Sequence, residues 1–467
     1  MYYVHLALDV TMVDDNRAPS SDSYRRRSVL KTLGAASGVV TLSLAGCLGA
    51  EDGGDGGDGG DGGDGGDGGS DGDGGGDGGD GDDGGDGDME DGGPVTVAGI
   101  YDLSGATSDV GRPTALGSRD AIRHFNENDT LGRQIEHPNN DYAYEVPQAQ
   151  QYYEEYTSDG EPPIITGWGT ADTEALAPKV AEDEIVYISA AYSAKLMEED
   201  TPYNFFGNLD YTSQGRAHLK WIADNDPDAT VGFIFSNTAF GKSPVEGGRQ
   251  YAEELGLDLA PDINLPLTAN SAETQVRKAR DAGVDYLIHQ NTAAPMQVLL
   301  SAKQDIYPEM TVCGLTRTVD ELRVQQNPET WEGTWAVNAF KSFDEVMDED
   351  TRGSQMIREN IEREGRSMDN PEVANLNYVR GGIHAILALK GLQNTIEMGM
   401  DPIDGANVRE GLLEIEDDDM WGLAEPFTYT EGDRRPTMTG RLYEVQDGEM
   451  QFDTTVELPR RDDWIGL

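Results

Sequence analysis

Residues 163–193 read PIITGWGTADTEALAPKVAEDEIVYISAAYS. Two short apolar runs, at 163–166 and 185–189, have the length and composition of buried β-strands. The segment between them, at 173–182, has the spacing of apolar residues that favours a helix. A strand, a helix and a second strand in this order are typical of a parallel sheet whose faces are covered by helices. The stretch therefore predicts an α/β fold.

The same alternation continues on both sides of this stretch. Further strands and helices are expected at the following positions: strands at 95–100, 230–235, 286–288, 311–313 and 335–337, and helices at 114–126, 214–225, 244–255, 276–282 and 295–303. Two consecutive sets of strands, with a long helical return at 378–395, predict two Rossmann-like α/β lobes. Ligands of such sheets bind beyond the carboxyl ends of the strands, so the loops after these strands are the candidate site.

The charge of the chain excludes one class of partner. The 467 residues include 88 Asp and Glu against 34 Lys and Arg, which gives a formal net charge of −54. A chain this acidic repels a polyanion, so a nucleic-acid partner is excluded. Few of the basic residues are lysine, and an acid-rich, lysine-poor surface suits high salt, where self-repulsion is screened. The composition favours a salt-adapted organism over an ordinary acidic protein.

The N-terminal segment has the features of an export signal. Three arginines at 25–27 precede an apolar run at 29–44, which is short for a membrane span and has the charge order of a secretory signal. Residues 26–31, RRSVLK, resemble a twin-arginine signal, and the sequence LAGC that ends at Cys47 resembles a lipobox. We expect residues 1–46 to be removed and Cys47 to carry a lipid that anchors the protein outside the cell. A buried N-terminal helix with an incidental cysteine is the alternative.

Residues 47–93 consist almost entirely of glycine and aspartate. They offer no large apolar core and keep high backbone freedom, so we expect a disordered tether. Collagen requires one glycine in three and abundant proline, and calcium-binding β-rolls require a large apolar residue in each repeat, so neither pattern fits. Loose cation binding by the aspartates stays open. The tether should hold the folded residues 94–467 away from the membrane.

Short sequences at the ends of the expected strands carry a family resemblance. These loops read YDLSGATSDVG at 101–111, GWGTADTEALAP at 167–178, ISAAYSA at 188–194, YNFF at 203–206 and FGKSP at 240–244. In this order and spacing they resemble the extracytoplasmic solute-binding proteins of branched-chain amino acid ABC transporters. With the acidic composition and the lipobox, the chain resembles a haloarchaeal lipoprotein of this family.

The resemblance implies a type I periplasmic-binding fold with a hinge of three crossover segments. Its expected lobes are about 94–211 with 340–396, and about 212–339 with 397–467. The resemblance also implies a receptor that binds a small amino acid or a related solute between the lobes and delivers it to ABC permease subunits. No cofactor, metal or enzymatic activity is expected. A ligand-binding module of a membrane sensor system is the alternative function.

The resemblance assigns ligand contacts to three residues of the first lobe. Thr170 is expected to meet the ligand carboxylate with its hydroxyl and N–H, Ala191 to accept from the ligand ammonium with its carbonyl, and Ser193 to contact the ligand with its hydroxyl. Hydroxyls and N–H groups at helix N-termini suit such a carboxylate. Helix capping is the alternative role of Thr170 and Ser193. The remaining candidates are Trp168, Gly169, Ser108, Asp109, Phe240 and Asn291.

The second lobe departs from the family pattern. Phe240 stands where a tyrosine is common, so a hydroxyl is missing. The acid that pairs with the ligand ammonium falls near residues 315–316, which are Leu and Thr. An amide or urea-like solute is therefore an alternative to an amino acid.

Enzymatic motifs are incomplete. The segment SNTAFGKS at 236–243 ends like a phosphate-binding loop but has serine where the first glycine is required. The six histidines lack metal-ligand spacing, and no cysteine–histidine pair supports a nucleophile. His289, near the expected cleft, is interpreted as a structural or rim residue. Of the two cysteines, Cys313 lies in an apolar strand and is expected to be a buried small hydrophobe.

Overall fold

The computed structural model describes residues 93–158 and 160–467. The expected signal at 1–46, the lipid site at Cys47 and nearly all of the expected tether lie outside these residues. None of the helices in the described part is both long and apolar enough to cross a membrane.

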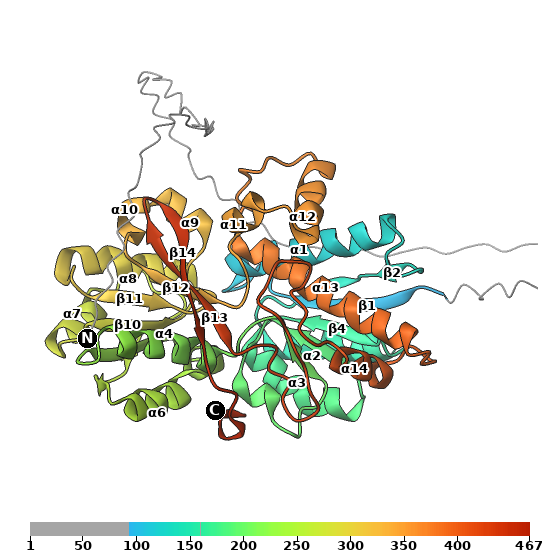
Figure 1. The fold of residues 1–467 in the computed structure, drawn as a ribbon, viewed down its shortest axis with the longest axis horizontal. Helices are drawn as coiled ribbons and strands as arrows, with labels where there is room; N and C mark the ends of the chain where they lie inside the picture. The colour runs from blue at the N-terminus through green and yellow to red at the C-terminus, as the bar shows by residue number, and fades with distance from the viewer. Residues whose placement is uncertain (1–92, 159) are drawn as a thin grey trace, which may run out of the picture. The chain divides into compact units, whose positions relative to one another are not determined.

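The first of two β-sheets is parallel throughout. Its strand order is β2-β1-β4-β5-β6, with β3 also paired to β1. The strands are β1 (Val95–Tyr101), β2 (Ile135–Glu136), β3 (Asn139–Asp141), β4 (Ile164–Gly167), β5 (Val186–Ser189) and β6 (Asn204–Phe206). Figure 1 shows this sheet between two groups of helices. These helices are α1 (Ser108–Glu127), α13 (Leu376–Glu397), α2 (Val146–Ser158) and α3 (Thr170–Glu182).

The second sheet is parallel except at one edge. Its order is β14-β13-β12-β11-β10-β7-β8, with β9 also paired to β7, and β13 and β14 run antiparallel. The strands are β7 (Thr230–Phe235), β8 (Asp258–Leu259), β9 (Ile263–Asn264), β10 (Tyr286–Gln290), β11 (Thr311–Gly314), β12 (Trp335–Asn338), β13 (Thr439–Gln446) and β14 (Glu449–Glu457). Its helices are α4 (Tyr211–Asn225), α5 (Ala239–Lys242), α6 (Val245–Leu255), α7 (Glu273–Asp281), α8 (Ala293–Ile306), α9 (Glu321–Gln326) and α10 (Pro328–Trp331). The two sheets confirm the predicted α/β fold.

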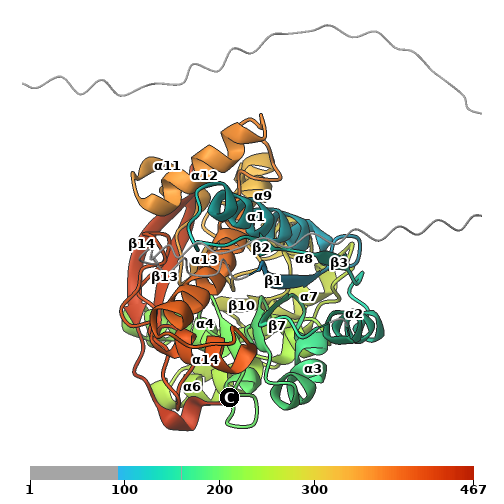
Figure 2. The same cartoon turned by 90° about the vertical axis from the view of Figure 1, so that its right-hand side faces the viewer.

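The C-terminal part of the chain is divided differently from our expectation. We expected residues 397–467 in the second lobe, but α14 (Gly405–Leu413) packs against α13 and contacts β5 of the first sheet. The hairpin of β13 and β14, which completes the second sheet, was not predicted. Figure 2 shows α14 beside α13.

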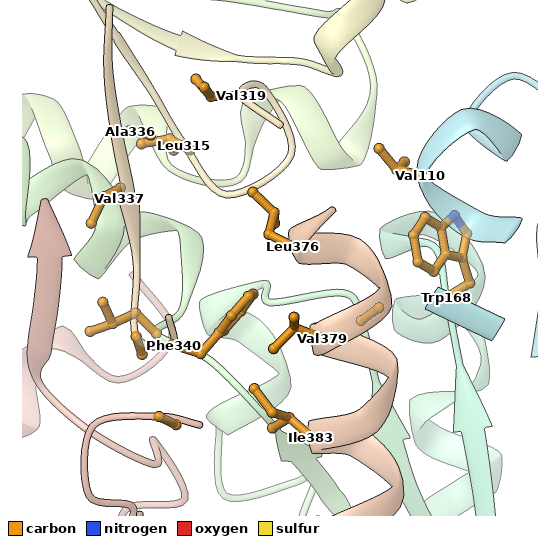
Figure 3. Close-up of a cluster of buried hydrophobic side chains, with 14 of the residues drawn as sticks. Val110, Trp168, Leu315, Val319, Ala336, Val337, Phe340, Leu376, Val379 and Ile383 are labelled. Atoms are coloured by element: carbon orange, nitrogen blue, oxygen red, sulfur yellow. The ribbon is translucent and has the colours of Figure 1, made fainter. Parts of the chain in front are cut away.

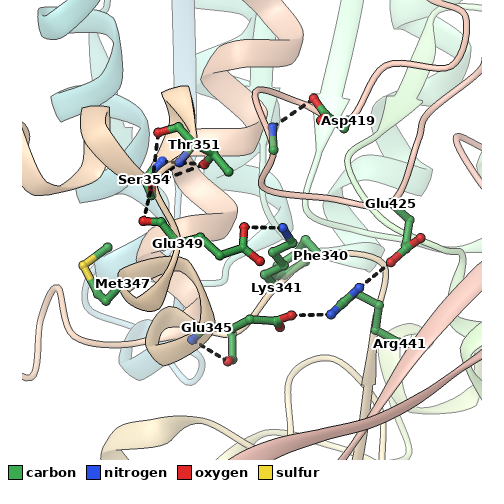
Figure 4. A network of polar contacts seen from close by, with 12 residues as sticks. Phe340, Lys341, Glu345, Met347, Glu349, Thr351, Ser354, Asp419, Glu425 and Arg441 are labelled. Carbon is green, nitrogen blue, oxygen red and sulfur yellow. Dashed lines mark hydrogen bonds and ion pairs between the residues drawn. The ribbon is translucent and has the colours of Figure 1, made fainter. Parts of the chain in front are cut away.

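The chain passes between the two sheets three times, after β6, after β12 and before β13. Asn208, in the first passage, connects two of them: its Oδ1 accepts from the N–H of Ala339, in the second passage, at 2.8 Å. The remaining helices of the second passage are α11 (Phe343–Asp348) and α12 (Arg352–Arg363). In Figure 4, Arg441 of β13 donates to both Glu345 and Glu425, which ties the second passage to the third.

Apolar side chains continue the core across these passages. Leu376, Val379 and Ile383 lie at helical spacing on one face of α13, and Figure 3 shows them beside Phe340 of the second passage. All four side chains are at most 1% exposed. Burial of a side chain of this size contributes roughly 1.5–3 kcal/mol. The N-terminal half of α13 is therefore anchored where the two lobes meet.

Candidate functional site

A cavity with an empty volume of about 250 Å³ lies between the loops that follow the strands of the two sheets. It is lined from the first lobe by Thr107, Val110, Tyr144, Trp168, Gly169 and Thr170, and from the second by Tyr211, Phe240, Thr292 and Arg317. The site lies where ligands of parallel sheets bind, beyond the carboxyl ends of the strands.

Thr170 is the first residue of α3 and presents a free hydroxyl to the cavity. The residue is 1% exposed, and its Oγ1 has no hydrogen-bond partner among the described residues. The first N–H groups of a helix have no acceptor within the helix, and the helix dipole makes this end favourable for negative charge. Thr170 can therefore offer both a hydroxyl and a backbone donor to a ligand oxygen.

Trp168 forms an oriented wall of the cavity. Its Nε1 donates to Thr107 Oγ1 at 2.8 Å, and Thr107 in turn donates its hydroxyl and its N–H to Asp102 at 2.7 and 2.8 Å. Asp102 is fully buried. This chain of hydrogen bonds fixes the orientation of the indole ring in the cavity wall.

Gly169, the residue before α3, lies where a side chain would clash with its neighbours. A Cβ at this position would lie 2.2 Å from Asp172 Oδ1 and 2.3 Å from the Tyr142 hydroxyl. Asp172 accepts from the Gly169 N–H at 3.2 Å and from the Tyr142 hydroxyl at 2.9 Å. Burial raises the pKa of the Asp172 carboxyl to about 7, so this group carries a partial charge at neutral pH.

Arg317 is a candidate site residue that the sequence analysis missed. It follows β11, is 4% exposed, and is the one charged residue among the described residues that line the cavity. Its guanidinium lies 4.5 Å from the ring centroid of Trp168 and 5.2 Å from that of Tyr192. Its Nη2 donates to the Ala190 carbonyl, while Nη1 has no partner in the described part of the chain. A basic residue three positions after the end of β11 was the signal available in the sequence.

The loop before Arg317 is held by groups from distant parts of the chain. Thr316 donates its N–H to Gln214 Oε1 at 3.0 Å. The Thr316 carbonyl and hydroxyl accept from Arg380 of α13 at 2.8 and 3.0 Å, and Asn208 Nδ2 also donates to the hydroxyl. These bonds fix the backbone beside Arg317 at the junction of the lobes.

Aromatic side chains of the second lobe cover the cavity. Phe240 is 5% exposed and packs edge-on against Tyr211, with ring centroids 5.4 Å apart. The Tyr211 hydroxyl donates to the Ala190 carbonyl at 3.3 Å, so the cover is tied to the first lobe. Gln290 Nε2 donates to the Phe240 carbonyl at 3.1 Å and supports it from β10.

The structure brings together Trp168, Gly169, Thr170 and Phe240. Five other candidates, Ser108, Asp109, Ala191, Ser193 and Asn291, do not line the cavity. Ser193 donates to Glu174 at 2.7 Å, and Ala191 is fully buried, with its N–H directed to Ser189 Oγ.

The other three candidates lie beside lining residues. Asn291 donates to the Leu265 carbonyl and accepts from the N–H of Thr292, which itself lines the cavity. Ser108 and Asp109 are in the first turn of α1, because this helix begins six residues before the expected position 114, and Asp109 lies 3.7 Å from Arg323. None of these three residues lines the cavity.

Metal-ligand geometry is absent from the described residues, in which no cluster of three His, Cys, Asp or Glu side chains could hold an ion. His289 is fully buried in β10 and does not line the cavity. Burial lowers the pKa of His289 to about 3, so the ring is neutral. Cys313 is buried as expected.

Residues 94–449 match the family model described as periplasmic binding protein. A substrate-binding protein of an ABC transporter from Aeropyrum pernix is 28% identical, with a TM-score of 0.74 over 80% of this chain and 98% of its own. A branched-chain amino acid ABC transporter protein from Thermus thermophilus with bound valine is 22% identical, with a TM-score of 0.72 over 77% and 95% of the two chains. A solute-binding protein from Rhodopseudomonas palustris in complex with p-hydroxybenzoic acid is 16% identical, with a TM-score of 0.65 over 78% and 97%.

No curated protein matches the sequence. The two structures that are less than 25% identical show a shared fold. The family model spans most of the chain and both sheets. The chain belongs to the periplasmic binding protein family, whose solved relatives include substrate-binding proteins of ABC transporters.

Proposed function

We propose that the protein is the extracytoplasmic solute receptor of an ABC importer, which binds a small organic solute between its lobes and delivers it to a permease. The observation that carries this proposal is the cavity itself. It is lined from both lobes, and two of its buried polar groups, the Thr170 hydroxyl and Arg317 Nη1, have no partner among the described residues. Buried polar groups are normally satisfied, so these two are available to bind a ligand.

Binding should shift an equilibrium between an open and a closed arrangement. Thr170 and Trp168 belong to the first lobe, whereas Phe240 and Arg317 belong to the second, so one solute contacts all four only when the lobes are closed. A ligand shifts the equilibrium toward the arrangement that it binds more tightly, and the closed arrangement offers it more contacts.

The proposed location is the outer face of the cell membrane. The proposal rests on the twin-arginine-like segment at 26–31 and on Cys47 at the end of the lipobox-like sequence. The glycine- and aspartate-rich residues 47–93 would supply the reach between the lipid anchor and the receptor. The acidic composition is consistent with a protein that works in high salt.

The proposed function is tested by a solute screen in molar salt. The full chain is titrated with amino acids, amides and carboxylates, and thermal stabilisation identifies solutes that bind. Small-angle scattering with a solute so identified should then report compaction, because the lobes close over it. Stabilisation by no member of the screen, or binding without compaction, would contradict the proposal.

A further inference from the structure

The cavity contains a positive charge that the protein does not neutralise. Arg317 is 4% exposed, and its Nη1 has no acceptor within the described residues. An arginine stays charged in proteins, and burying an unpaired charge is costly. Its contacts with the faces of Trp168 and Tyr192 compensate for part of this cost, but neither ring carries a negative charge.

The cavity is correspondingly poor in groups that would bind an ammonium. The described lining contains no carboxylate. The nearby Asp102 is already engaged by donors of Gly105 and Thr107. The Ala190 carbonyl accepts from both Arg317 and the Tyr211 hydroxyl. The protein's own guanidinium therefore occupies the carbonyl adjacent to that of Ala191, the residue whose carbonyl we expected to bind a ligand ammonium.

Donors also face the cavity from the first lobe. Thr170 supplies its unpartnered hydroxyl and lies at the N-terminus of α3, a helix of 13 residues. The lining also includes the aromatic side chains of Tyr144, Trp168, Tyr211 and Phe240. Donors from both lobes around an aromatic interior suit a negatively charged head and an apolar body.

We propose that the solute is a small organic monocarboxylate without an ammonium group, and that Arg317 is the residue that selects it. The carboxylate accepts from the Thr170 hydroxyl in the first lobe and from the Arg317 guanidinium in the second, and its apolar body packs against Trp168 and Phe240. This inference rests on the proposed receptor function and specifies its solute class. It excludes both classes that the sequence left open, since an amino acid brings a second cation to Arg317 and an amide brings no charge.

The test compares solutes that share a carbon skeleton. One set is isovalerate, isovaleramide and valine, and the second is phenylacetate, phenylacetamide and phenylglycine. Calorimetric titration of the full chain in molar salt should show that the carboxylate binds at least tenfold more tightly than its amide and its α-amino acid in one set. Tighter binding of valine, phenylglycine or either amide would overturn the inference and leave the receptor function intact. Binding by none of the carboxylates would overturn it as well.

Variants then assign the preference to Arg317. Arg317→Gln should weaken carboxylate binding roughly ten- to a hundredfold and reduce the preference for carboxylate over amide, whereas Arg317→Lys should keep more of that preference. Arg277→Gln is the matched control, because Arg277 is 53% exposed on α7 and pairs with Glu273 at 3.8 Å, away from the cavity. A carboxylate-to-amide ratio that Arg317→Gln leaves unchanged would refute the role of Arg317. This ratio is independent of any general loss of stability.

Discussion

Two threonines one turn apart on α3 allow binding and stability to be separated. Thr170 Oγ1 has no partner among the described residues, whereas Thr173 Oγ1 donates to the Gly169 carbonyl at 2.6 Å and lies 2.9 Å from Ser189 Oγ. Both residues are buried. Replacement by valine keeps the shape of each side chain and removes one hydroxyl, so the two substitutions differ in which hydrogen bonds are lost.

Thr170→Val should impair binding and leave the fold intact. Without ligand, this substitution breaks no hydrogen bond of the described protein, so the free energy of unfolding should change by less than about 0.5 kcal/mol or rise. With ligand bound, a solute oxygen loses its donor in a dry cavity, which costs about 1–3 kcal/mol, or roughly five- to 150-fold in affinity. Calorimetric titration with the tightest-binding solute measures the affinity, and denaturant unfolding measures the stability.

Thr173→Val should give the opposite result. It removes both hydrogen bonds and leaves buried oxygens of Gly169 and Ser189 with fewer partners, which should lower the free energy of unfolding by about 1–3 kcal/mol. The affinity of the folded protein should fall less than in Thr170→Val. If Thr170→Val binds the solute as tightly as the parent, or if it is the less stable of the two variants, Thr170 does not contact the solute.

Other predictions concern the cover of the cavity, the anchor, the salt requirement and pH. Phe240→Ala should weaken binding by roughly 1.5–3 kcal/mol in a titration, while circular dichroism still shows a folded protein. Cys47→Ala should release the protein from membranes, and an unmodified Cys47 within a longer mature chain by mass spectrometry would contradict the lipid anchor. The midpoint of thermal unfolding should fall as salt is lowered from molar to decimolar, because the Debye length grows from about 3 to about 10 Å around a chain of net charge −54. Burial raises the pKa of Glu321 to about 8, so the fold keeps a proton that the unfolded chain has released, and stability should fall between pH 7 and 8 by roughly 1 kcal/mol. Glu321→Gln should reduce that fall in unfolding experiments.

Buried parallel strands were the predictable part of the fold. The strand expected at 230–235 is β7 (Thr230–Phe235), because a strand covered on both faces is an uninterrupted apolar run. The hairpin of β13 and β14 was missed because β14 is largely exposed and mostly polar. Its turn did carry a signal: Asp447 and Gly448 have positive φ angles of 54° and 81°, and Asp-Gly is a preferred pair for a two-residue hairpin turn.

The candidate site also contains residues that local sequence predicts and residues whose roles depend on distant parts of the chain. Trp168 follows β4 directly and Thr170 begins α3 two residues later, so local sequence determines their place at the sheet edge, and the family resemblance assigned Thr170 its ligand contact. Ser193 also follows a strand, but Glu174 of α3 takes up its hydroxyl, and that pairing is not visible in a local pattern. Arg317 was missed because its position depends on residues that lie more than 60 positions away in the chain, such as Arg380.

Arg317 and Arg380 connect the charge of the solute to the closure of the lobes. Arg380 of α13 is fully buried, and burial, together with the positive charge of Arg317, lowers its pKa to about 9. The same Arg380 binds Thr316 and so holds the loop that carries Arg317 at the junction of the lobes. In the closed arrangement, two guanidinium groups therefore share a buried region whose cavity lining, within the described residues, contributes no anion. A carboxylate in the cavity relieves this repulsion, and it does so most when Arg317 lies against the first lobe. The solute thus stabilises closure through its charge as well as its contacts, which is the differential affinity that a binding-driven conformational change requires.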